Sequence, residues 1–240
     1  MEDHNEEILD AGMFVGSLDS VERAEFIKRT YQHVALAVLV FILLEVLFLN
    51  TPFIANFAMS LTQGWTWLLM LGGFSLVTSY AEGWAMKTDN VQHQYWALIL
   101  FTAAEAFIFV PMLYIVINVL GAPQLLMQAG VLTLGLFAGL SAVVLLTGKD
   151  FSFLRSALMI GSIIAIAAIV GGIAFGFNLG LFFSVAMVVL AAGSILYQTS
   201  NMIHKYKTTQ HVAAALGLFG ALMLLFWYIL SILMRFAGND

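Results

Sequence analysis

Seven long apolar stretches, separated by short polar connections, dominate this 240-residue chain. A membrane-spanning helix needs about 20 consecutive and mostly apolar residues. Charged residues make up only 10% of the chain, against about 25% in a soluble domain, which is too few to coat a globular surface in water. The pattern therefore predicts an all-α membrane protein, a seven-transmembrane helix bundle with spans at residues 31–49, 65–81, 95–119, 124–147, 156–175, 179–199 and 211–236.

The basic residues are distributed unevenly between the connections. Cytoplasmic loops of membrane proteins carry an excess of Lys and Arg. The ninth basic residue, Arg235, lies near the C-terminus, and the loops after the first, third and fifth stretches contain none. The distribution predicts a cytoplasmic N-terminus and, with an odd number of spans, a C-terminus outside. The other eight basic residues all lie on the predicted cytoplasmic side: Arg23, Lys28, Arg29, Lys87, Lys149, Arg155, Lys205 and Lys207.

The segment before the first stretch is polar and acidic at its start. The first ten residues contain five acidic residues and no Lys or Arg, which is not the pattern of a cleavable signal peptide. We therefore expect an acidic cytoplasmic tail at residues 1–28, followed by a seven-span membrane domain at residues 29–240. Low apolar content and like charge favour an extended tail.

Several function classes lack their characteristic residues. The chain has no cysteine, which excludes disulfides, thiolate metal sites and thiol nucleophiles. The formal net charge of −5, with no basic patch, argues against a nucleic-acid partner. No HExxH, Walker or GxSxG motif is present. The sequence predicts neither an enzyme nor a resident cofactor.

Two carboxyl groups, Glu45 and Glu105, lie within predicted spans, where charge is costly and commonly functional. At about 1.5 Å per residue, Glu105 lies roughly 15 Å into its span, near the midplane. No Lys or Arg lies in the interior of a span, so each carboxyl must be protonated, hydrogen-bonded, hydrated or bound to a cation. Both are candidates for an ion pathway or a proton site; the alternative is a neutral acid bonded between helices. Glu82 lies at the predicted cytoplasmic end of its span, where a headgroup-level position explains it.

Small residues recur at helical spacing. Gly135 and Gly139 form a GxxxG pair, and Gly217 shares a face with alanines at positions 214 and 221. Small residues at this spacing let membrane helices pack closely. We expect helix packing rather than a pathway lining at these positions. Pro111 removes a helical hydrogen bond and predicts a kink in the third span.

Four segments carry a family resemblance. They read TAAEAF at 102–107, FAGLS at 137–141, TGKDFSFL at 147–154 and GSILYQTSNMIH at 193–204. These segments resemble the Bax inhibitor-1 family, and especially its bacterial YccA-like branch. The resemblance extends from about residue 26 to the end of the chain, and the KDFS and TSNMIH portions are its most specific parts.

The resemblance implies a seven-span fold whose last helix is central. It implies two kinds of activity. Some members act as pH-sensitive calcium leaks gated by a pair of aspartates, whereas the YccA-like branch is linked to the membrane protease FtsH as a substrate and modulator. Two close carboxylates form a proton switch because they cannot both ionise easily. Here the two gate positions are Gln198 and, approximately, Ala221, neither of which titrates.

Two functional hypotheses follow. The first is a multi-pass protein of the bacterial inner (plasma) membrane that resembles the YccA-like modulator and substrate of FtsH, with the lipid bilayer and the protease as partners. The second is a Ca²⁺ or H⁺ leak of the Bax inhibitor-1 type without its di-aspartyl gate, for which Ca²⁺ is the transported ion rather than a cofactor.

Overall fold

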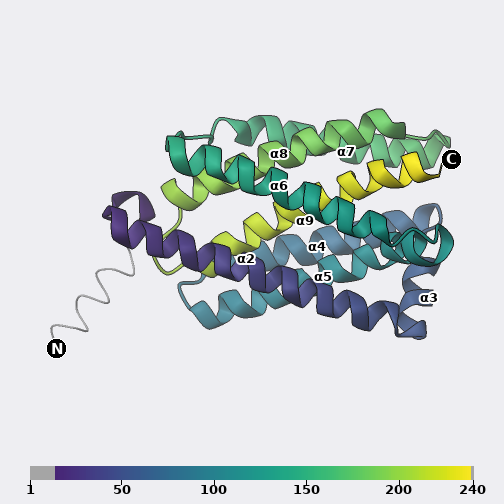
Figure 1. Cartoon of the computed structure of the whole chain (residues 1–240), viewed down its shortest axis with the longest axis horizontal. Coiled ribbons are helices and arrows are strands. Elements are labelled where there is room, and N and C mark those ends of the chain that lie inside the picture. The colour runs from purple at the N-terminus through teal and green to yellow at the C-terminus, as the bar shows by residue number, and fades with distance from the viewer. Residues whose placement is uncertain (1–13, 239–240) are drawn as a thin grey trace.

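A computed structural model of the chain describes residues 14–238 (Figure 1). Each predicted span falls within one long helix, so the all-α class is confirmed. A short helical turn, Val15–Ser17, precedes the bundle, and a π-helical turn, Ile115–Val119, extends the third long helix. The α-helices of the described part are α2 (Ser20–Leu49), α3 (Pro52–Ser60), α4 (Trp65–Lys87), α5 (Val91–Tyr114), α6 (Gln124–Thr147), α7 (Leu154–Phe175), α8 (Gly180–His204) and α9 (His211–Ala237).

Six of these helices are long and apolar enough to cross a membrane: α2, α5 with its π-helical turn, α6, α7, α8 and α9. Helix α4 is also long enough, with 23 residues, but it is less apolar because it contains several Thr and Ser residues and Glu82. The predicted total of seven spans is therefore supported for six helices by composition and length.

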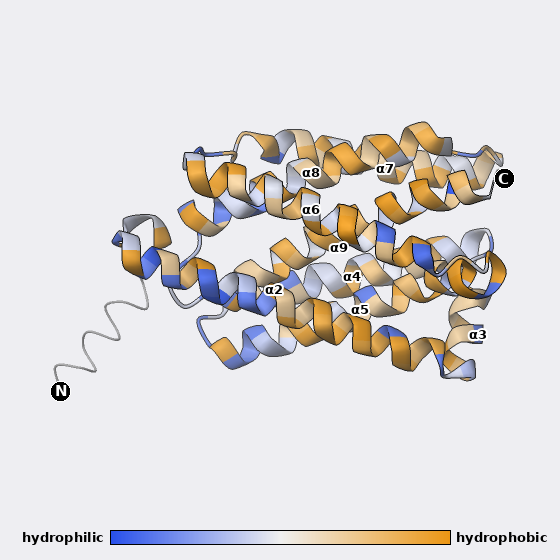
Figure 2. Cartoon of the chain, in the orientation of Figure 1, coloured by the Kyte–Doolittle hydropathy of each residue, from blue (hydrophilic) through white to orange (hydrophobic). Residues whose placement is uncertain are grey.

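Apolar side chains cover the outside of the bundle. Leu146 and Phe182 expose 86% and 85% of their surface, and the exposed faces of α6, α7 and α8 are mostly hydrophobic (Figure 2). Contiguous apolar surface of this extent is not found on soluble monomers. The helices are therefore solvated by lipid, and the chain is an integral membrane protein.

Helix α9 runs through the middle of the bundle. It passes between a layer of α6, α7 and α8 and a layer of α2, α4 and α5 (Figure 1), and it packs against α2, α4, α5, α6 and α8. Most of its residues from Val212 to Leu230 are buried. Its aromatic side chains interlock with neighbouring helices: Phe219 contacts Phe41 of α2 and Phe101 of α5.

The predicted tail is only partly within the described residues. Residues 1–13 lie outside them. Residues 14–18 pack on the connection between α8 and α9: Phe14 forms a β-bridge with Lys207, and the Val15 N–H donates to the Tyr206 carbonyl oxygen at 3.0 Å. Asp19 then caps α2 by accepting from two backbone N–H groups at 2.8 Å, so the regular helix begins at Ser20.

Pro52 and Gly176 lie at helix ends, whereas Pro111 lies inside α5. Pro52 begins α3, a short helix that the sequence analysis did not anticipate. Regular α-helix continues past Pro111 to Tyr114 and then passes into the π-helical turn. Gly176 ends α7 with φ +74°, a conformation that favours glycine, and Phe177 of the following turn packs against Gly172 of α7.

Candidate functional site

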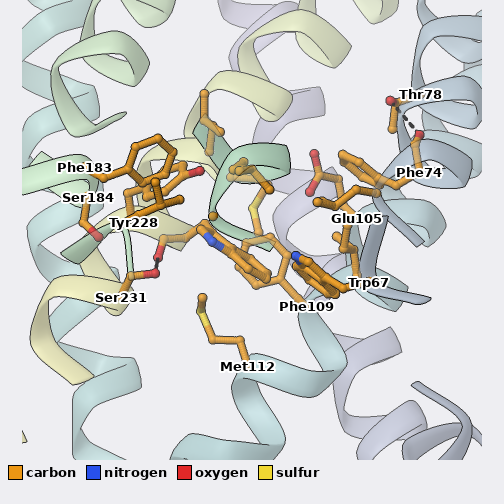
Figure 3. Close-up of a pocket in the computed structure, with 18 of the residues that line it drawn as sticks. Trp67, Phe74, Thr78, Glu105, Phe109, Met112, Phe183, Ser184, Tyr228 and Ser231 are labelled. Carbon is orange, nitrogen blue, oxygen red and sulfur yellow. Dashed lines mark hydrogen bonds between the residues drawn. The ribbon is translucent and has the colours of Figure 1, made fainter. Parts of the chain in front are cut away.

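A cavity of about 750 Å³ lies between α4, α5 and α9 on one side and the α7–α8 turn on the other (Figure 3). Its lining extends along α4 from Trp67 to Glu82 and along α9 from Gly220 to Arg235. At 1.5 Å per residue each of these distances is roughly 22 Å. The cavity therefore extends over much of the hydrocarbon thickness of a bilayer, which is about 30 Å.

Glu105 of α5 lines the middle of this cavity. Its residue surface is only 6% exposed, and Figure 3 shows its carboxyl group directed into the space. It makes no hydrogen bond or ion pair with any residue in the described part of the chain. The Phe101 ring packs against α9 at Gly220, and the Phe109 ring packs against Trp227 of α9. Glu105 lies midway between these two phenylalanines on α5, so it faces the α9 segment between Gly220 and Trp227.

A second carboxyl group, that of Glu82, also lines this cavity. It is near enough for its charge to act on Glu105 and also on Tyr206, which lies in the connection between α8 and α9. Burial and this negative charge raise the pKa of the Tyr206 hydroxyl above its usual value. From the sequence, Glu82 was expected at headgroup level. Its position five residues before the end of α4 did not reveal that it shares a cavity with Glu105.

Aromatic side chains form much of the wall. The indole rings of Trp67 and Trp227 stack with centroids 6.2 Å apart, and Phe109 meets Trp227 edge to face at 4.9 Å. Where α8 meets α9, the rings of Phe183 and Tyr228 lie 6.0 Å apart (Figure 3). The hydrophobic pattern alone did not single out any of these residues, because aromatic residues occur throughout the predicted spans.

Glu45, the other predicted pathway residue, does not line this cavity. It is 4% exposed, and both carboxyl oxygens lack a hydrogen-bond partner within residues 14–238. It lies one helical turn after Phe41, whose ring contacts Phe109 and Phe219. The structure thus brings Glu105 together with Glu82 and leaves Glu45 enclosed elsewhere.

The two gate positions of the family lie at the interface of α8 and α9. A Cβ placed at Gly217 would lie 3.0 Å from the Gln198 side-chain oxygen, so this glycine lets the amide rest against α9. Ala221 is buried one turn farther along α9. Neither Gln198 nor Ala221 is part of the cavity lining.

The glycine pair of α6 has different surroundings. A Cβ placed at Gly135 or Gly139 would meet no atom within 4 Å, and both residues are exposed. These glycines therefore do not bring α6 against another described helix of the same chain. The spacing identified a face of small residues, but it could not tell which helices face each other.

The two most specific motif segments meet at the end of the bundle nearest the N-terminus. The Ser200 hydroxyl donates to an Asp150 carboxylate oxygen at 3.1 Å and accepts from the Phe151 N–H at 2.9 Å. Hydrogen bonds from the Ser152 N–H and hydroxyl hold the pKa of the Asp150 carboxyl below its usual range. The His204 ring donates to the Ser200 carbonyl oxygen at 2.9 Å. This network fastens the α6–α7 connection to α8.

The long lipid-facing helices define a multi-span integral membrane protein, and an acidic cavity lies between them. A sequence model of the family described as inhibitor of apoptosis-promoting Bax1 matches residues 23–238. The chain belongs to the Bax inhibitor-1 family, as its motif segments indicated.

Three relatives illustrate the range of the family. The modulator of FtsH protease YccA from Escherichia coli is 38% identical over 101 residues, which are 42% of this chain and 45% of YccA. An uncharacterised protein of Campylobacter jejuni is 30% identical over 90% of this chain and 91% of its own length. Bax inhibitor 1 from Schizosaccharomyces pombe is 30% identical over 72% of this chain and 64% of that protein. The match to YccA thus covers less than half the length of that relative.

Proposed function

We propose that this protein resides in a bacterial inner membrane and modulates a membrane protease of the FtsH type. The observation that carries the proposal is the 38% identity to YccA, which is named as a modulator of FtsH. The chain contributes no catalytic step in this role. It acts as a binding partner that alters how the protease handles its membrane substrates.

A seven-span topology with a cytoplasmic N-terminus accompanies this proposal. Helix α4 packs beside α5 and α9 in the bundle, exposes Leu69 and Leu76, and at about 1.5 Å per residue is roughly 34 Å long. That length suffices to cross a hydrocarbon core of about 30 Å. Eight of the nine basic residues lie on α2 and on the connections at the end of the bundle nearest the N-terminus. An excess of Lys and Arg marks the cytoplasmic side.

Co-purification tests the protease association. The tagged full chain is extracted with mild detergent from bacterial membranes that contain FtsH, and a tagged membrane protein of another family serves as the control. We expect FtsH to be recovered with this chain and not with the control. Recovery of equal amounts with both proteins would contradict the proposal.

The cavity favours a second candidate function, an ion leak. Ca²⁺ takes hard oxygen ligands, and Glu105 with Glu82 supplies carboxylate oxygens in a space that extends along much of α9. Because Gln198 and Ala221 cannot titrate, the two gate positions give such a leak no pH response. Any response to pH between about 6 and 8 would come from the carboxyl pair of Glu105 and Glu82. Calcium flux into liposomes carrying the protein and its Glu105→Gln variant tests this candidate. A steep pH response that is unchanged in Glu105→Gln would contradict it.

A further inference from the structure

Protease modulation does not use two features of the cavity, the unpaired carboxyl group of Glu105 and the aromatic walls around it. Glu105 as a whole residue is 6% exposed, and its carboxyl group is directed into the cavity and has no hydrogen-bonding partner in the described chain. A carboxyl group held away from bulk water is stable either as the neutral acid or as a carboxylate that a positive charge accompanies. Glu82, the other acidic group of the lining, adds negative charge rather than neutralising it.

The walls favour a cation that carries an apolar body. A positive charge is attracted to the face of Trp most strongly, and also to Tyr and Phe. Trp67, Trp227 and Phe109 form a contiguous aromatic surface, and Phe183 with Tyr228 forms another where α8 meets α9 (Figure 3). The volume of about 750 Å³ lies within the range of sites that enclose small organic ligands.

Glu105 and Glu82 supply carboxylate oxygens, but the lining offers few further oxygen ligands with which to hold a bare metal ion in place. The hydroxyl groups of Thr78 and Ser231 are engaged with carbonyl oxygens of their own helices, at 2.9 and 2.8 Å. Ca²⁺ takes 6–8 oxygen ligands, whereas most of this lining is hydrocarbon. An organic cation needs one counter-charge and apolar contacts, which is what the cavity offers.

We propose that this cavity binds a lipophilic organic cation, an ammonium or phosphonium ion with apolar substituents, whose charge is paired with Glu105 and whose substituents pack on Trp227 and Phe109. Met223 lies in the α9 segment that faces Glu105. The only basic residue of the lining, Arg235, lies twelve residues farther along α9. That separation is roughly 18 Å at 1.5 Å per residue. The ligand's charge therefore lies deep in the cavity and not at the end near Arg235. This binding does not depend on the protease association.

Two ions of nearly the same shape and opposite charge provide the test. Radiolabelled tetraphenylphosphonium and tetraphenylborate are bound separately to the detergent-solubilised full chain by equilibrium dialysis. We expect saturable binding of the phosphonium, with the borate at least about tenfold weaker, equivalent to about 1.4 kcal/mol. Equal binding of the two ions would show simple apolar partitioning and would overturn the proposal.

The Glu105→Gln variant tests the assigned counter-charge, and Glu45→Gln is its matched control because Glu45 is buried outside the cavity. We expect phosphonium affinity to fall about tenfold or more in Glu105→Gln and to stay within about twofold in Glu45→Gln. Unchanged affinity in Glu105→Gln would overturn the proposal. If that variant does not fold, the preference between the two ions on the unaltered protein decides the question by itself.

Discussion

Glu45 is a buried carboxyl group with no hydrogen-bond partner for either oxygen among the described residues. Burying a polar group without a partner costs about 1–3 kcal/mol in proteins. Replacing Glu45 with Met, an unbranched side chain of similar length, is therefore expected to raise the free energy of unfolding by about that amount. The midpoint of thermal unfolding in detergent, compared with that of the unaltered protein, measures it. A lowered midpoint would mean that the carboxyl group has a stabilising partner, such as a bound ion.

Glu45 and Glu105 could be identified from the sequence, because an acidic residue is conspicuous in an apolar run. It could not separate their roles. Whether Glu105 or Glu45 faces a cavity depends on how α4, α5 and α9 pack, and no local pattern encodes that packing. It also missed Glu82, because a carboxyl group near a helix end is ordinarily explained by the lipid headgroups.

The contact of α5 with α9 depends on a glycine. A Cβ placed at Gly220 would lie 2.9 Å from the tip of the Phe101 ring, a buried and rigid group. Gly220→Leu should force these helices apart and destabilise the protein by about 1–3 kcal/mol, the usual cost of overpacking. Gly139→Leu is the matched control, because a side chain there meets open space. Thermal unfolding of both variants in detergent is the measurement, and equal stability of the two would contradict the packing at Gly220.

At the level of elements, long helices were the most predictable feature. A run of about 20 apolar residues specifies a spanning helix almost irrespective of its neighbours. The short helix α3 and the docking of residues 14–18 were not predicted. Both are small elements whose stability comes from contacts with distant parts of the chain, as the bond from Val15 to Tyr206 illustrates.

Eight of the nine basic residues of the whole molecule lie at one end, and this asymmetry gives the expected orientation. A reporter that is active only in the cytoplasm is expected to be silent when fused after Asp240 and active when fused before Met1. The physical reason is that Lys and Arg are retained on the cytoplasmic side during insertion. Activity of the C-terminal fusion would mean that the number of spans is even or that the orientation is reversed.

The central position of α9 was expected from the family resemblance and from the small residues that recur at helical spacing in its span, at positions 214, 217 and 221. The sequence of α9 is apolar nearly all round, which is compatible with burial in protein or with exposure to lipid. What distinguishes the two environments is the set of helices that surround it, α2, α4, α5, α6 and α8. That arrangement is a property of the assembled bundle.

Modulation of the protease is tested by the lifetime of a membrane substrate of FtsH other than this chain. It is measured by pulse-chase in cells that make this chain and in cells that do not, each with and without FtsH. We expect a longer lifetime when the chain is present, and only in cells that contain FtsH, because the chain occupies the protease within the membrane. An unchanged lifetime in FtsH-containing cells that make the folded chain would contradict it.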